Sequence, residues 1–536
     1  MSTIPRWTRD PRPGTAEYTA PLPEGLPAGP AAVRAAHAKV LAALSAAPGD
    51  PALRVDVTDR GRDRVLRLRY RTDVLDREAA ARIAGYHLAA LAAPVRHSLL
   101  SEAELRYQLE ELAGPCRELP DRRVHELFEE RAARHPDAVA VVSAAGQRTY
   151  GELNARANRI GRALLAHGLR PEGVVAVLLE QNLDWPAAVL GILKAGGVCL
   201  PIGARLPVGQ VRTMLDRADY SLLLGPDSVA AAYAEEHADT DLGVPVAAHG
   251  PATLHFTSGS GSAGEPRGAT GEHAGFANHV LAKIDDLGLG AGDVVAQTAP
   301  PYRAGSLWQL LSPLLAGGRT LLVGPETVRD VPRFVDTIER GRVCVVQVRP
   351  SYLESMLAEL ERHPRELPQL RRVAVTGEPL RTDLVRRWFR AQPSVPLVNS
   401  CGLPETSGDT HHEILHDVPA GHWVPLGRPI ANVRVYVVDE RLVPVPLGAP
   451  GEIVFSGVCV GRGYVNDPEG TRAAFTEDPY RPGERLYRGG DRGRRLPDGK
   501  LELLGRRDEP ATRDPGRPHG PRGTALASLS TRPGLY

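Results

Sequence analysis

The chain has 536 residues, which is too long for a single hydrophobic core, so we expect several domains or subdomains. Its 42% of apolar and 24% of charged residues are ordinary for a water-soluble globular protein, and charges of both signs are interleaved. A net charge of +1 gives no electrostatic reason to expect nucleic acid or a membrane surface as a partner.

The chain has five widely spaced cysteines, Cys116, Cys199, Cys344, Cys401 and Cys459. They form no Cys-x-x-Cys pair, which argues against a zinc site and against a disulfide framework. The polar, proline-rich residues 1–13 show no signal-peptide pattern, and no run of 18 apolar residues follows them. We therefore expect a cytoplasmic protein without a targeting or membrane-spanning segment.

The N-terminal part of the chain predicts a small separate unit that ends near Pro94. Residues 1–30 are rich in Pro and Gly and are expected to form a loose arm. The periodicity that follows predicts a helix at 31–47, a strand at 65–70 and a second helix at 76–92. Residues 101–112 look like a linking helix, with Ser101 at the N-cap and Glu104 at capping-box spacing.

A longer region of alternating strands and helices begins near residue 113. We expect strands at 139–142, 174–179, 198–202, 294–298, 320–323, 343–348 and 372–376, and helices at 150–168 and 185–196. This alternation predicts a parallel sheet covered by helices, in which ligands gather at the carboxyl ends of the strands.

The pattern changes beyond Trp423. Short strands at 433–439, 451–456 and 500–504, separated by Pro and Gly turns, predict a small antiparallel sheet or barrel. Residues 510–536 consist largely of Pro, Gly and Arg, and they are not expected to form a core.

The stretch 257–268 is difficult to explain by folding alone. It follows an apolar run, 252–256, and is rich in Gly, Ser and Thr, so a strand is expected to open into a polar loop. Inward-pointing N–H groups, hydroxyls and one cation suit the phosphates of a nucleotide. A flexible surface linker explains the loop alone equally well, and the Gly-Lys-Ser/Thr ending of a Walker loop is absent.

Lysine is scarce in this chain. It occurs only at Lys39, Lys194, Lys283 and Lys500, and nearly all other positive charge is arginine. Any chemistry that requires a lysine therefore has four candidates.

Seven motifs occur in order along the chain. They lie at 149–153, 193–197, 257–268, 399–405, 451–464, 487–491 and 505–508. Over about 124–508 the sequence thereby resembles the adenylation domains of nonribosomal peptide synthetases, which are acyl-adenylate-forming ligases. Residues 66–91 also resemble the last strand and helix of a condensation domain, but the His-His-x-x-x-Asp motif of condensation activity is absent.

The resemblance implies an α/β fold. It corresponds to the large N-terminal core of the family, with two parallel-rich sheets covered by helices and a small β-barrel-like subdomain, and with the small C-terminal domain missing. We expect a condensation-domain-like remnant and linker at 1–112, the adenylation core at 113–508 and an irregular Pro/Gly/Arg-rich tail at 509–536. A shifted reading frame would produce such a tail.

The chemistry implied by the resemblance is attack of a carboxylate on the α-phosphate of ATP, which gives an acyl-AMP and pyrophosphate. Mg²⁺ and fixed donors would stabilise the charge on the phosphate oxygens. By the family pattern, Glu405 would hold Mg²⁺, Arg267 would close the phosphate loop and Asp491 would accept the ribose hydroxyls. A solvated loop acid is the alternative for Glu405, and a turn residue is the alternative for Asp491.

The full set of nucleotide-binding positions implied by the family is Thr257, Ser258, Gly259, Ser260, Gly264, Arg267, Gly377, Glu378, Pro379, Asn399, Cys401, Gly402, Asp491 and Arg506. The acid-binding positions are Ala304, Gly305, Trp308, Gln347, Ala374, Thr376, Ser400, Gly408 and Asp409.

One acid-binding position departs from the family in a way that bears on the substrate. Ala304 stands where the family has the Asp that pairs with the substrate α-ammonium, and a buried ammonium without a carboxylate is costly. We therefore expect an acid that lacks this amine or carries it elsewhere. Asp409 could receive a displaced amine, or it could be a solvent-facing loop acid before His411 and His412. These two histidines are more simply explained as structural residues than as metal ligands.

Further departures concern the nucleotide. Arg267 replaces the closing lysine in a loop about two residues longer than usual, and Cys401 replaces the stacking aromatic. Leu403 and Pro404 replace Pro-Thr, which removes a hydroxyl. No lysine follows Lys500, so the lysine of the family's C-terminal domain is absent, as is a carrier-protein serine motif.

Two functional hypotheses follow. In the first, the chain is an adenylating enzyme for an unusual small carboxylic acid, working with a separate carrier protein, a small helper protein or a lysine supplied by another protein. In the second, it is a catalytically impaired adenylation fold that serves as a binding or scaffolding module or is a synthetase remnant. A CoA ligase of the same superfamily fits the condensation-like flank less well.

Overall fold

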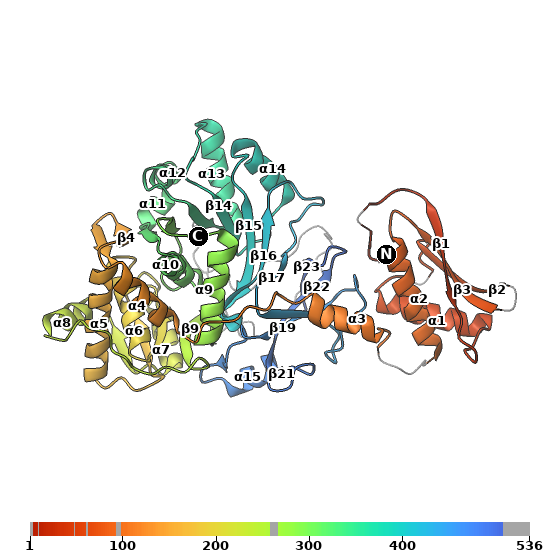
Figure 1. The fold of residues 1–536 in the computed structure, drawn as a ribbon, viewed down its shortest axis with the longest axis horizontal. Coiled ribbons are helices and arrows are strands. Elements are labelled where there is room, and N and C mark those ends of the chain that lie inside the picture. The colour runs from red at the N-terminus through yellow and green to blue at the C-terminus, as the bar shows by residue number, and fades with distance from the viewer. Residues whose placement is uncertain are drawn as a thin grey trace.

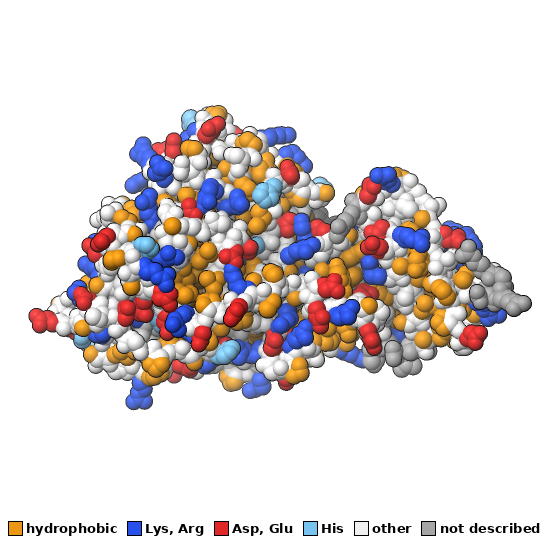
Figure 2. Space-filling view, viewed as in Figure 1, with side chains coloured by type: hydrophobic (Ala, Val, Ile, Leu, Met, Phe, Trp, Pro, Cys, Tyr) orange, Lys and Arg blue, Asp and Glu red, His pale blue; other side chains and the backbone are white. Residues whose placement is uncertain are grey.

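The computed structural model describes residues 4–8, 10–47, 49–60, 63–92, 98–257 and 266–507. Figure 1 shows a large body and a smaller N-terminal unit, with the linking helical segment between them. Figure 2 shows acidic and basic side chains interspersed over the visible face, as the interleaved sequence predicts. Among the described residues, no helix combines the length and apolarity needed to cross a membrane.

The N-terminal unit is a three-stranded antiparallel sheet with two helices. The strand order is β1 (Thr15–Pro21), β3 (Asp63–Arg71), β2 (Leu53–Arg60), and the helices are α1 (Pro30–Ala43) and α2 (Arg77–Ala92). The predicted helices and the strand at 65–70 are confirmed. The prediction of a loose arm over 1–30 is wrong, because β1 pairs with β3 along its whole length. Proline is tolerated at the end of an edge strand, so Pro21 did not prevent this pairing.

A helical segment joins this unit to the body. It consists of α3 (Glu102–Arg106) and a π-helical turn, η1 (Tyr107–Glu111). The predicted N-cap is confirmed, since Ser101 Oγ accepts a hydrogen bond of 3.1 Å from the backbone of Glu104. Gln108 donates a 3.0 Å hydrogen bond to the carbonyl of Val445, which ties this segment to the C-terminal β-rich part.

The body contains a six-stranded sheet with the order β20-β10-β9-β7-β6-β8. Its strands are β6 (Val174–Val177), β7 (Val198–Pro201), β8 (Leu222–Leu224), β9 (Pro251–Thr257), β10 (Arg267–Glu272) and β20 (Gly463–Tyr464). β6, β7, β8 and β9 run parallel, while β10 turns back along β9. The associated helices are α5 (Tyr150–Ala166), α6 (Asp184–Lys194), α7 (Val208–Ala218) and α8 (Pro226–Ala234).

A nine-stranded sheet has the order β17-β16-β15-β14-β13-β11-β12-β4-β5 and a parallel centre. Its strands are β4 (Val139–Ser143), β5 (Gly146–Thr149), β11 (Val294–Gln297), β12 (Arg319–Leu322), β13 (Val345–Val348), β14 (Arg372–Thr376), β15 (Leu397–Leu403), β16 (Gly408–Leu415) and β17 (Arg428–Pro429). Its helices are α4 (Val124–Arg134), α9 (His273–Leu287), α10 (Gly305–Ala316), α11 (Pro325–Arg329), α12 (Val331–Arg340), α13 (Pro350–Arg362) and α14 (Thr382–Ala391).

The predicted antiparallel part is confirmed as a five-stranded sheet, in which β18-β19-β22-β21 are neighbours and β23 pairs with β22. The elements are β18 (Val433–Val438), β19 (Gly451–Gly457), α15 (Pro468–Ala474), β21 (Phe475–Glu477), β22 (Arg485–Arg495) and β23 (Leu501–Arg506). Strand β22 was not predicted, because its run of charged and glycine residues lacks the apolar alternation that marks a strand.

The two parallel-rich sheets share one core, which also contains apolar side chains of α4, α5, α6, α9 and α10. A separate core under the nine-stranded sheet receives the helices α12, α13 and α14. The family motif at 149–153 has a structural basis here. Thr149 and Glu152 cap α5 reciprocally, and the Tyr150 hydroxyl donates to backbone carbonyls on both sides of the α10 C-terminus.

Candidate functional site

A cavity of about 190 Å³ opens at the carboxyl ends of β11, β13 and β14, where a parallel sheet is expected to bind its ligand. Of the predicted acid-binding residues, it brings together Ala304, Gly305, Trp308, Gln347, Thr376, Gly408 and Asp409. The two others are not on the lining. Ala374 is fully buried within β14, and Ser400 accepts a hydrogen bond from the buried Lys283.

The entrance to α10 forms one wall of this cavity. Ala304 is the N-cap of α10, and its neighbour Arg303 also lines the cavity, with its guanidinium 5.5 Å from the ring centre of Tyr302. A second arginine, Arg349, lies on the same lining and approaches Glu378 to 3.8 Å. Burial, and then the charge of Arg303, lower the pKa of Arg349. This wall is therefore rich in positive charge.

Two glutamines differ in how their amide groups are used. The side-chain oxygen of Gln309 accepts hydrogen bonds of 3.0 Å from the backbone of both Thr298 and Ala299, which fixes the loop after β11. Gln347 lies on the cavity lining, and its buried Oε1 has no hydrogen-bond partner in the described structure. Because a buried acceptor without a donor is unfavourable, Gln347 is a natural contact for a ligand.

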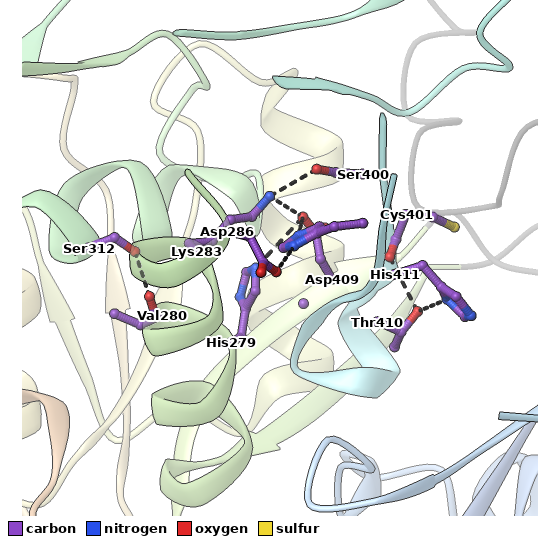
Figure 3. A network of polar contacts seen from close by, with 12 residues as sticks. His279, Val280, Lys283, Asp286, Ser312, Ser400, Cys401, Asp409, Thr410 and His411 are labelled. Atoms are coloured by element: carbon purple, nitrogen blue, oxygen red, sulfur yellow. Dashed lines mark hydrogen bonds and ion pairs between the residues drawn. The ribbon is translucent and has the colours of Figure 1, made fainter. Parts of the chain in front are cut away.

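The cavity floor, to which His279 and Asp409 contribute, is backed by a lysine that was counted in the sequence but not placed at the site; Lys283 itself is not among the lining residues. Lys283 is fully buried on α9, and its ammonium lies 2.5 Å from Oδ2 of Asp409 and 3.0 Å from Oγ of Ser400 (Figure 3). The same ammonium lies 4.7 Å from the ring centre of Trp308. A lysine within a helix whose other side chains are mostly buried was the available signal, since burying it requires a partner.

The alternative of a solvent-facing Asp409 does not hold, because only 14% of its side chain is exposed. His412 lies between two carboxylates, at 2.6 Å from Asp286 and 3.4 Å from Asp409. His411 contacts the Thr410 hydroxyl at 3.0 Å instead. The histidine pair thus serves two separate polar networks.

A narrower pocket of about 30 Å³ adjoins the cavity and shares Gly377 with it. It gathers the predicted residues Gly377, Glu378, Pro379, Asn399 and Cys401, and also Ser400. Trp423, which was not predicted, lines the same pocket. The pocket is much smaller than the roughly 150 Å³ that holds a benzene ring, so its side chains must move before a purine can enter.

Asp491 and Arg506 form a buried pair beside this region. Arg506 donates to Oδ1 of Asp491 at 2.7 Å, and the side chains of Arg506 and Asp491 are 5% and 6% exposed. Strands β22 and β23 place the two residues directly opposite each other. The turn alternative for Asp491 does not hold, because Asp491 is a paired strand residue.

Glu405 and Arg267, the residues expected to hold Mg²⁺ and to close the phosphate loop in catalysis, both contact Tyr464. The Tyr464 hydroxyl donates a 2.9 Å hydrogen bond to Oε1 of Glu405, and the Arg267 guanidinium lies 5.2 Å from the ring centre. Arg267 also forms a 3.2 Å ion pair with Asp467. Glu405 is buried, not a solvated loop acid, and burial raises its pKa.

Glu405 is compatible with a magnesium ion that is held mainly by phosphates. A single carboxylate at a closed site is the protein ligand such an ion requires, because Mg²⁺ often keeps waters and binds substrate phosphates. The described residues contain no group of three or more His, Cys, Asp or Glu side chains arranged to hold a metal by themselves.

The phosphate-loop residues Ser258, Gly259, Ser260 and Gly264, and Asp508 at the end of the motif at 505–508, lie outside the described residues. The strands on either side of the loop are described. Thr257 at the end of β9 pairs with Arg267 at the start of β10, so the glycine-rich stretch connects two adjacent antiparallel strands. The tail at 509–536 also lies outside the described part of the chain.

Comparison with known proteins agrees with this geometry. The AMP-binding enzyme family matches residues 128–465. Tyrocidine synthase 3 of Brevibacillus parabrevis is 34% identical over 72% of this chain, and gramicidin S synthase 2 of Brevibacillus brevis is 31% identical over 76%. The chain covers only 6% and 9% of these two synthetases.

A solved structure of the nonribosomal peptide synthetase FmoA3 superposes with a TM-score of 0.76 at 29% identity, over 86% of this chain and 52% of that one. Other structures of the same protein are an AMPPNP-bound form and an alpha-methyl-L-serine-AMP-bound form. With the motifs, the two parallel-rich sheets and these matches together, the chain belongs to the AMP-binding enzyme family and has the fold of a nonribosomal peptide synthetase adenylation domain.

Proposed function

We propose that the chain activates a small carboxylic acid that lacks an α-ammonium group. A carboxylate oxygen of the acid attacks the α-phosphorus of ATP, the bond from that phosphorus to the bridging oxygen breaks, and pyrophosphate leaves with the electron pair. The product is an acyl-AMP for transfer to a carrier protein in secondary-metabolite biosynthesis.

The charge of the cavity is the observation that carries this proposal. Arg303 and Arg349 line the wall beside Ala304. Of the described lining residues, Asp409 alone carries a carboxylate, and that carboxylate is already paired with Lys283. A substrate α-ammonium would therefore face positive charge with no acid to balance it, which is strongly unfavourable in a buried site.

In this proposal, separate described residues contact the ribose, the base, Mg²⁺ and the phosphates. Asp491, held by Arg506, accepts the ribose hydroxyls, and Cys401 and Trp423 border the base. Glu405 would hold Mg²⁺, which supplies charge stabilisation at the phosphates. Arg267 stands at the end of the phosphate loop and can turn from Asp467 to a phosphate oxygen, because the two are similar acceptors.

The proposal also covers the N-terminal unit and the partners of the chain. We infer that residues 1–112 are a condensation-like remnant that serves at most as a docking surface. The activated acid needs an acceptor, so the proposal includes a carrier protein and a small helper protein as partners.

ATP–pyrophosphate exchange tests the proposal directly. The chain would be assayed with a panel of aryl, hydroxy, keto and β-amino acids beside the matching α-amino acids. We expect exchange with members of the first group and none with the second. Exchange driven only by α-amino acids would contradict the substrate class. Nucleotide binding by calorimetry without any exchange would favour the alternative, a binding or scaffolding module.

A further inference from the structure

The cavity floor is backed by a lysine–aspartate pair from two distant parts of the chain, in which Asp409 lines the cavity and Lys283 lies buried behind it. Lys283 comes from α9 and Asp409 from the start of β16, and Figure 3 shows their side chains pointing toward each other. Lys283, His279 and His412 all contact the same oxygen, Oδ2 of Asp409, at 2.5, 3.8 and 3.4 Å respectively.

The Lys283–Asp409 pair is electrically balanced before a substrate arrives. The buried ammonium of Lys283 offsets the carboxylate of Asp409. Burial lowers the pKa of His279, so its ring is neutral at ordinary pH. His412 has a second carboxylate of its own, Asp286, at 2.6 Å. An additional charge brought to this floor would have no counter-ion, which is costly in a buried site.

The floor nevertheless has unused capacity to accept hydrogen bonds. A carboxylate offers about four lone-pair sites, and Asp409 lines the cavity with part of its side chain exposed. Gln347 presents a buried Oε1 without a partner to the same cavity. Two acceptors thus converge on the cavity, and Trp308 supplies a flat apolar wall beside them.

We propose that Lys283 is a specificity-determining residue, which neutralises Asp409 so that the floor selects an uncharged hydrogen-bond donor, such as a hydroxyl or carboxamide, at the far end of the acid. This inference rests on the proposed function and narrows its substrate class. An acid that carries an ammonium in this place is rejected, because Asp409, the counter-ion that the ammonium would need, is already paired with Lys283.

The size of the cavity limits the acid further. A volume of about 190 Å³ is slightly more than the roughly 150 Å³ of a cavity that holds benzene. The substrate is therefore a compact acid, of the size of one substituted ring or a short branched chain.

The test compares matched acids that differ only in a terminal hydroxyl or ammonium. Suitable pairs are para-(hydroxymethyl)benzoate with para-(aminomethyl)benzoate, their ortho and meta isomers, and aliphatic ω-hydroxy acids with ω-amino acids of equal length. Calorimetry on the full chain gives the ratio of the two dissociation constants for the pair that binds best. No exchange activity is needed for this readout.

The informative variant is Lys283→Met, which keeps the length of the side chain and removes its charge. We expect the ratio to shift toward the ammonium acid by about tenfold or more, because Asp409 then lacks a counter-ion. Lys194→Met is the matched control: Lys194 is also fully buried and lies 3.0 Å from Asp241, but Asp241 does not line the cavity, whereas Asp409, the partner of Lys283, does. It should leave the ratio unchanged.

A second variant covers the case in which Lys283→Met does not fold. In the double variant Lys283→Met with Asp409→Asn the floor is neutral again, so we expect the preference for the hydroxy acid to persist. An unchanged ratio in Lys283→Met, a similar shift in Lys194→Met, or no binding of any hydroxy acid by the wild-type chain would each overturn the proposal.

A spectroscopic measurement separates this inference from the proposed function. The chain has only four lysines, so isotope labelling of their ammonium groups gives a simple spectrum in which Lys283 is assigned by substitution. Binding of the hydroxy acid without ATP should shift the Lys283 signal. A shift without adenylation would contradict the proposed function alone, whereas adenylation without a shift would contradict the role of Lys283.

Discussion

Tyr464 donates a 2.9 Å hydrogen bond to Glu405, the carboxylate that we expect to hold Mg²⁺. Burial raises the pKa of Glu405, and the hydrogen bond from Tyr464 acts in the opposite direction. Tyr464→Phe should therefore raise this pKa further, so that Mg²⁺-dependent nucleotide binding needs a higher pH than in the wild type. The pH dependence of ATP affinity with and without Mg²⁺ would show the change, and identical profiles would contradict it.

Glu405→Gln should stabilise the fold while it weakens Mg²⁺-dependent binding. The folded chain holds the Glu405 proton more tightly than the unfolded chain, so the free energy of unfolding falls as pH rises from the ordinary glutamate pKa through the raised one. Glutamine carries no charge, so it avoids the cost of burying a carboxylate, and it can still accept a hydrogen bond from Tyr464. We expect a gain of about 0.5–2 kcal/mol at neutral pH, measured by denaturant unfolding. A clear loss of stability would contradict the prediction.

The Asp491–Arg506 pair should respond differently to one substitution than to two. Asp491→Ala leaves a buried guanidinium without its carboxylate, which typically costs about 3–5 kcal/mol. Asp491→Ala combined with Arg506→Met removes both charges and should recover much of that loss. Denaturant unfolding gives the coupling energy. Equal stability of the single and double variants would show that the pair is not coupled.

Trp423 should supply the flat face that Cys401 lacks in the narrow pocket. Trp423→Ala is expected to weaken ATP binding by about 1–3 kcal/mol, the range measured when an aromatic residue that stacks on a base is removed. Trp423→Phe keeps a flat ring and should retain most of the affinity. Calorimetry would measure both. Tighter binding by the alanine variant would indicate that Trp423 closes the pocket instead.

Ala304→Asp should widen the substrate range toward α-amino acids. The new carboxylate at the N-cap of α10 would balance a substrate ammonium at the positively charged wall. We expect the relative affinity for α-amino acids to rise by about tenfold or more. Ala304→Asn has the same size without the charge and serves as the control. An equal effect of both substitutions would show that charge does not decide the selection.

Four buried histidines should make the fold sensitive to mild acid. Burial lowers the pKa of His87, His255 and His273 to about 4 and that of His125 to about 3. Unfolded histidine takes up a proton near its usual pKa of about 6.5, so stability falls as pH drops from about 6.5 toward 4. Each group can contribute a loss of up to about 3 kcal/mol. Thermal unfolding at neutral pH and at pH 5 would measure it.

The sequence was informative where a pattern repeats locally. Alternating apolar strands and capped helices specified the parallel sheets, and the strand at 372–376 matches β14 in full. Strand β1 and strand β22 were missed for a shared reason, since their polar and charged residues gain stability from pairing with a neighbouring strand and not from apolar periodicity.

The site was predictable where residue type and motif position determine the role. Ala304, Gln347 and Asp409 do lie on one cavity. Lys283 and Trp423 were not placed, because neither belongs to a local motif and each reaches the site only through tertiary packing. The role of the buried Lys283 can be recognised only when its partner is known, and that partner, Ser400, lies on a strand more than a hundred residues away.

Helix α9 carries His279, Lys283 and Asp286 at spacings of four and three residues, so all three project from the same side of one rigid element. The chemistry of the cavity floor is therefore concentrated in about two turns of helix together with the start of β16. A designer who wished to change which acid is accepted could exchange that short segment together with its partners Ser400, Asp409 and His412.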